Sequence, residues 1–164
     1  MKMIREIADK LERQYGTSSP FELCDYLNIE FFRSELPETV RGLCFQKDDN
    51  CSIILISSSL DENESRYCCA HELGHALLHP GLNAQVMADL TNLCVPRLEH
   101  EADYFAACLL IDPAIEEWCE MYEPLTLKNI ACLAGLPQGV VNLWHETAER
   151  DGTGIRWKKS EAIC

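Results

Sequence analysis

Residues 70–79 read Ala-His-Glu-Leu-Gly-His-Ala-Leu-Leu-His, and the spacing of their polar side chains decides how the chain is interpreted. In an α-helix, His71 and His75 lie one turn apart on the same face, so both imidazoles can reach a single metal ion. Glu72 lies at the edge of that face, where it can contact a water molecule more easily than the metal. This pattern is typical of zinc hydrolases in which the glutamate acts as general base.

Two further properties of this segment favour a metal site. Gly74 costs about 1 kcal/mol of helix stability relative to alanine, which indicates that a packing partner or a bound substrate needs bare backbone there. Residues 68–78 are otherwise mostly apolar, so the polar side chains would sit in a largely buried setting. Buried polar groups need partners, and a metal ion provides one.

His79 continues the four-residue spacing, but helix rise places it about 12 Å from His71 along the axis, too far to bind the same ion. We interpret it as a histidine stabilised by the negative end of the helix dipole. A contact with the site or the substrate is the alternative. His100 and His145 have no motif around them.

A helix predicted over residues 98–110 is the source of a third ligand, because it is apolar after Asp103 and must be buried. Glu99 and Asp103 share a face, so one can bind the metal while the other accepts the free ring N–H of a ligand histidine. Glu101 points to another side. We favour Glu99 as the third ligand, with Glu101 as one alternative and simple helix capping as the other.

The remaining pattern predicts an α+β fold, with a small antiparallel sheet of about three strands packed on a mostly helical domain. A capping box at Ser59 begins the helix that ends near His79, and residues 81–96 form a loop with at most one short helix. Other helices are expected at 4–15, 20–27, 113–121, 126–134 and 138–149, and strands at 29–32, 43–45 and 52–56. Residues 1–150 would form one domain, and residues 151–164 a tail.

Composition narrows the partners and the compartment. The 164 residues carry 27 acidic and 14 basic side chains, a net charge of −13, which disfavours binding to nucleic acid or an anionic membrane. No stretch is long and apolar enough to span a bilayer. The ten cysteines form no Cys-x-x-Cys pair and predict reduced thiols in the cytoplasm. The oligomeric state is left open.

Residues 70–79, followed by Glu99-x-Glu-Ala-Asp103-x-Phe-Ala-Ala-x-Leu-Leu110, resemble the ImmA/IrrE family of metallopeptidases. The resemblance covers residues 1–113 well and implies a zincin-like fold with a gluzincin-type site. By position, His71, His75 and Glu99 match the metal ligands and Glu72 the catalytic base. Asp103 stands where Asp or Asn is common.

The resemblance also implies a substrate, a DNA-binding repressor of the helix-turn-helix class on a phage, a mobile element or a stress regulon. We therefore expect a zinc endopeptidase that cleaves such a repressor, with Mn²⁺ as the alternative to Zn²⁺. The alternatives are a regulatory module that binds the repressor without cutting it, and a metallohydrolase with another substrate. Zincins commonly hold the substrate against a sheet edge, for which residues 51–56 are the candidate. Tyr67, Tyr104 and His145 are equal candidates for stabilising the oxyanion.

Residues 126–149 are predicted to form a helical subdomain similar to a helix-turn-helix. Between Leu125 and Glu149 the only Lys or Arg is Lys128, so a recognition helix here would offer little to phosphates. We expect this unit to serve in packing or in docking a partner, without direct contact to nucleic acid.

Overall fold

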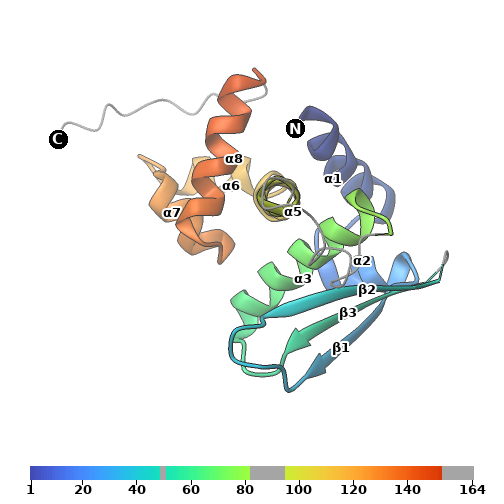
Figure 1. The fold of residues 1–164 in the computed structure, drawn as a ribbon. Coiled ribbons are helices and arrows are strands. Elements are labelled where there is room, and N and C mark those ends of the chain that lie inside the picture. The colour runs from blue at the N-terminus through green and yellow to red at the C-terminus, as the bar shows by residue number, and fades with distance from the viewer. Residues whose placement is uncertain (49–50, 82–94, 153–164) are drawn as a thin grey trace.

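The structure is a computed structural model that describes residues 1–48, 51–81 and 95–152 (Figure 1). Its helices are α1 (Lys2–Tyr15), α2 (Pro20–Tyr26), α3 (Glu62–Leu78), α5 (Val95–Ile111), α6 (Ile115–Met121), α7 (Leu127–Ala134) and α8 (Gln138–Arg150). Its strands are β1 (Glu30–Ser34), β2 (Gly42–Asp48) and β3 (Cys51–Ser57). The expected α+β fold is confirmed. The predicted short helix within 81–96 and most of the predicted tail lie outside the described residues.

Local signals explain where the first helices begin and end. Gly16 ends α1 in the left-handed conformation, with φ of 68°, which glycine adopts at little cost. Ser19 caps α2 by accepting a hydrogen bond from the backbone N–H of Glu22.

The capping box of α3 lies two residues later than predicted. Asp61, not Ser59, caps the helix, accepting from the Glu64 N–H at 2.8 Å, while the Glu64 carboxylate accepts from the Asp61 N–H at 3.1 Å. The hydroxyl of Ser59 is instead hydrogen-bonded to that of Ser57, the last residue of β3, at 2.8 Å. The end of the strand therefore engages the residue that the pattern assigned to the helix.

The sheet is mixed, in the order β1-β3-β2, and corrects the prediction of a purely antiparallel one. β2 and β3 pair antiparallel, whereas β1 pairs parallel to β3. Because β3 lies between the other two strands, the chain crosses from one side of β3 to the other between β1 and β2. The predicted edge at residues 51–56 is also wrong, since Ile54 and Ile56 belong to the buried central strand. Within the described residues, β2 is an edge strand that pairs on one side only.

The helices stack in layers over one face of the sheet (Figure 1). α3 lies across β2 and β3, α5 packs on α3, and α8 packs on α5 from the side away from the sheet. A Cβ atom on Gly74 would lie 3.2 Å from Cα of Ala102, so bare backbone lets α3 and α5 approach closely. The packing partner therefore explains the glycine, and the contact brings the C-terminal half of α3 against the middle of α5.

The last two helices complete the core. Val141 and Trp144 of α8 are buried, and the Trp144 indole donates to Asp112 Oδ1 at 2.8 Å. Gly135 ends α7 in the left-handed conformation. One face of α8 is thus used for packing. None of the described helices combines the length and the apolar character that a membrane crossing requires.

Candidate metal centre

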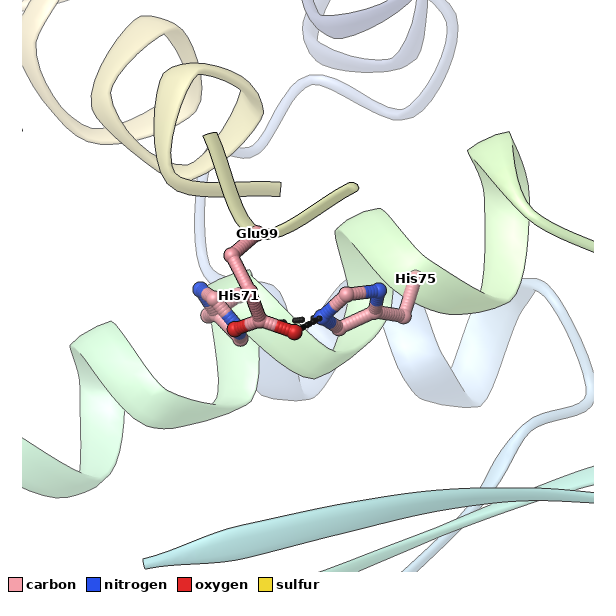
Figure 2. Close-up of side chains that lie close together, drawn as sticks. All are labelled: His71, His75 and Glu99. Carbon is pink, nitrogen blue, oxygen red and sulfur yellow. Dashed lines mark hydrogen bonds and ion pairs between the residues drawn. The ribbon is translucent and has the colours of Figure 1, made fainter. Parts of the chain in front are cut away.

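Three side chains predicted to share a metal converge between α3 and α5 (Figure 2). His71 Nε2 lies 3.1 Å from His75 Nε2 and 3.3 Å from Glu99 Oε2, and His75 Nε2 lies 3.4 Å from Glu99 Oε1. In the parts of the chain that the structure describes, this is the one group of His, Cys, Asp and Glu side chains arranged to hold a metal ion.

The donor set and its spacing fit a divalent cation. Two imidazole nitrogens and one carboxylate oxygen are the ligands of many catalytic zinc sites, which leave one position open. Ligands at about 2.0–2.1 Å from a tetrahedral ion lie roughly 3.3 Å from one another, close to the three separations observed here. The histidine side chains are 15% and 13% exposed but Glu99 is 42% exposed, so the group opens to solvent on the side of Glu99.

His71 is held from its other ring nitrogen, as the sequence predicted. Its Nδ1 lies 2.8 Å from Asp103 Oδ1, and the Tyr67 hydroxyl donates to the same oxygen at 2.7 Å. Burial lowers the pKa of His71, but the hydrogen bonds to Asp103 and Glu99 outweigh it and raise that pKa to about 10. These carboxylates favour positive charge at the centre, which a divalent cation supplies.

A second set of contacts at the centre involves His79, for which a contact with the site was only the alternative interpretation of the sequence. His79 Nδ1 lies 3.0 Å from His75 Nδ1, and His79 Nε2 lies 3.0 Å from Glu101 Oε2. Glu101 therefore turns toward α3, contrary to its predicted direction, while Glu99 takes the place beside the two Nε2 atoms. The signal for this contact is the four-residue spacing of His75 and His79, which places the two imidazoles on one face of α3.

Glu72 lies in the wall of a pocket next to His71. Its residue is 8% exposed and lines a pocket of about 350 Å³ together with His71, Tyr67, Cys68 and residues 39–42. Burial raises the pKa of Glu72, and the neighbouring histidines His71 and His75 act in the opposite direction. A Cβ atom on Gly42 would lie 3.0 Å from Glu72 Oε1, so the first residue of β2 touches this carboxylate.

The three candidates for the oxyanion are placed very differently. The Tyr67 hydroxyl bonds Asp103 beside His71, at the wall of the pocket. Tyr104 is fully buried in α5 under the Arg5 guanidinium, and His145 pairs with Glu149 on α8 at 3.6 Å. Of the three, Tyr67 is the one that lines the pocket beside His71 and Glu72.

Comparisons with known proteins show which family and which relatives the chain resembles. The family model for Peptidase M78, described as the IrrE N-terminal-like domain, matches residues 24–119, which contain the sheet, α3 and α5. The chain is 34% identical over 141 residues to "Uncharacterized immunity region protein 2" of Bacillus phage phi105, covering 86% of this chain and 88% of that protein. It is 26% identical over 142 residues to "Metallopeptidase ImmA" of Bacillus subtilis, covering 86% of this chain and 83% of that one.

Proposed function

Because the chain belongs to the Peptidase M78 family of IrrE N-terminal-like metallopeptidases, we propose that it is a zinc-dependent endopeptidase of the gluzincin type that cleaves a helix-turn-helix repressor in the cytoplasm. The observation that carries the proposal is the convergence of His71, His75 and Glu99 beside the buried carboxylate of Glu72. Zinc suits two imidazoles and a carboxylate, and manganese is the second candidate.

The proposed chemistry assigns one task to each side chain. His71, His75 and Glu99 would hold the metal, which supplies Lewis-acid activation of a water and of the scissile carbonyl. Glu72 accepts a proton from the attacking water and delivers it to the nitrogen of the departing peptide. Asp103 fixes the ring of His71, so that its Nε2 stays directed at the centre.

The edge of β2 is the surface on which the substrate would lie. β2 pairs only with β3 among the described residues, so its other side can bind an extended peptide through backbone hydrogen bonds. Its first residue, Gly42, lies beside the carboxylate of Glu72, which supports a substrate path from this edge to the proposed reacting groups. The adjoining pocket, with its thiol and aromatic walls at Cys68 and Tyr67, would take one substrate side chain of moderate size.

We expect Gly42→Ala to reduce cleavage about 100-fold while the bound metal is retained. The new Cβ atom would lie 2.5 Å from Cys68 Sγ and 3.0 Å from Glu72 Oε1, so something must move at the point where the geometry matters most. A misplacement of about 1 Å near the chemistry costs on this order. Steady-state cleavage rates and metal content of the purified variant measure the two quantities.

Two further variants test the cause of that loss. Adding Cys68→Ala to Gly42→Ala removes the closest contact and should restore part of the rate. Gly139→Ala, where nothing lies within 4 Å of the new Cβ atom, should leave the rate unchanged. Wild-type cleavage by Gly42→Ala would show that the start of β2 does not position Glu72.

The charge of the chain and the names of its relatives support a repressor as substrate. A net charge of −13 suits docking to a basic DNA-binding protein and speeds the encounter at low salt. One relative is named for a phage immunity region and another is named ImmA metallopeptidase. Backbone pairing along β2 has little sequence selectivity, so the choice of substrate would come from this docking.

The direct test is cleavage of a helix-turn-helix repressor, which the proposal expects to be encoded beside this protein. Purified enzyme loaded with zinc or manganese is expected to cut it at one or a few sites, more slowly as salt rises, and to leave casein almost untouched. A stable complex without cleavage would support the binding-module alternative. Rapid digestion of casein would exclude a selective endopeptidase.

A further inference from the structure

We propose that His79 and Glu101 are positioning residues that fix the ring of His75 at the metal centre, an inference that rests on the proposed metal site. The contacts form one continuous path from His75 Nδ1 to His79 Nδ1 at 3.0 Å, from His79 Nε2 to Glu101 Oε2 at 3.0 Å, and from Glu101 Oε1 to the Arg97 Nε–H at 2.8 Å. The path joins the end of α3 to the first turns of α5.

The direction of each hydrogen bond follows from the ligand role of His75. If His75 Nε2 presents its lone pair to a metal, the ring proton lies on Nδ1 and is donated to His79 Nδ1. His79 then carries its own proton on Nε2 and donates it to Glu101, whose carboxylate can only accept. Arg97 donates to the second oxygen of that carboxylate. In this arrangement each of these hydrogen bonds has one donor and one acceptor, and the lone pair of His75 Nε2 remains available to the metal.

Burial distinguishes this role from simple stabilisation by the helix dipole. The His79 side chain is 5% exposed and Glu101 is 19% exposed, so both lie away from most of the solvent that would otherwise satisfy them. A histidine that only complemented the end of α3 would not need partners at both ring nitrogens. The two ligand histidines are therefore held differently: a carboxylate contacts His71 directly, whereas an imidazole stands between His75 and its carboxylate.

Cobalt binding to the metal-free protein is the test, because the absorption of bound Co²⁺ reports affinity without any measurement of activity. We expect His79→Phe to weaken Co²⁺ binding 10–100-fold, the usual effect of losing a partner of a ligand histidine. His79→Asn places an amide oxygen near the position of Nδ1 and should recover most of the affinity. His100→Phe, at an exposed position of α5, is the matched control and should bind Co²⁺ like the wild type.

Each outcome has a separate meaning. Thermal unfolding of each metal-free variant shows whether it is folded, and the rise in Tm on adding Co²⁺ gives a second measure of binding. Equal affinity of His79→Phe and wild type would overturn the positioning role while leaving the metal site intact. A wild-type protein that binds no Co²⁺ would instead overturn the proposed function. In the zinc-loaded protein, nitrogen NMR should find the proton of His79 on Nε2, and a proton on Nδ1 contradicts the proposal.

Discussion

Glu72→Gln is expected to lower peptide cleavage by about 10²–10⁴-fold, the usual contribution of a positioned general base. The amide has the size of the carboxylate but cannot accept a proton from the attacking water. Because Glu72 is not one of the three side chains that could bind the metal, its replacement should leave the metal content unchanged. Cleavage of the repressor and elemental analysis of the same preparation measure the two effects.

The control for this experiment is Glu62→Gln, the same substitution at an exposed position in the first turn of α3. It should cut at the wild-type rate. Circular dichroism of Glu72→Gln should match the wild type, since the buried carboxylate is replaced by a group of equal volume. Undiminished cleavage by Glu72→Gln would show that the proposed mechanism is wrong.

Glu99→Ala should abolish stoichiometric metal binding, because it removes one of three donor groups and leaves two histidines on one helix. Asp103→Ala removes only the hydrogen-bond partner of His71 and should weaken binding 10–100-fold. Glu101→Ala should have a similar intermediate effect through His79. Affinities from competition with a chromophoric chelator, measured for all three variants, give the ranking.

His75→Ala belongs to the same series and should lose metal as fully as Glu99→Ala. Wild-type metal content in either variant contradicts the assigned ligands. If Glu101→Ala lost the metal and Glu99→Ala retained it, the third ligand would be Glu101.

The parts of the site that follow from spacing within one helix could be predicted from the sequence. His71 and His75 share a face by helix geometry alone, and the apolar pattern after Asp103 identified α5 as a buried neighbour with carboxylates at its start. Only one assumption about packing was then needed to bring Glu99 and Asp103 to the histidines. The structure places both where that assumption required.

Features that depend on the relation between distant segments could not be predicted in this way. Strand order is one: the pattern of β1 is compatible with either edge and either direction, so the parallel pairing to β3 had no local signal. The meeting of His79 with Glu101 is another, because it depends on how α3 and α5 are aligned along each other. The cap of α3 is a third. The capping-box pattern predicts Ser59 as the cap, and nothing in the sequence reveals that the Ser59 hydroxyl is hydrogen-bonded to Ser57 instead.

The close approach of α3 and α5 at Gly74 means that a residue with no metal-binding atom can determine how well the metal is held. The contact with Ala102 lies one helical turn beyond Glu99 on α5, and on α3 it sits beside His75. Side chains of increasing size at position 74 would push the two helices apart in steps and carry the carboxylate away from the imidazoles. Replacing Gly74 in turn by alanine, serine and valine would therefore lower metal retention in steps, although every metal ligand is still present.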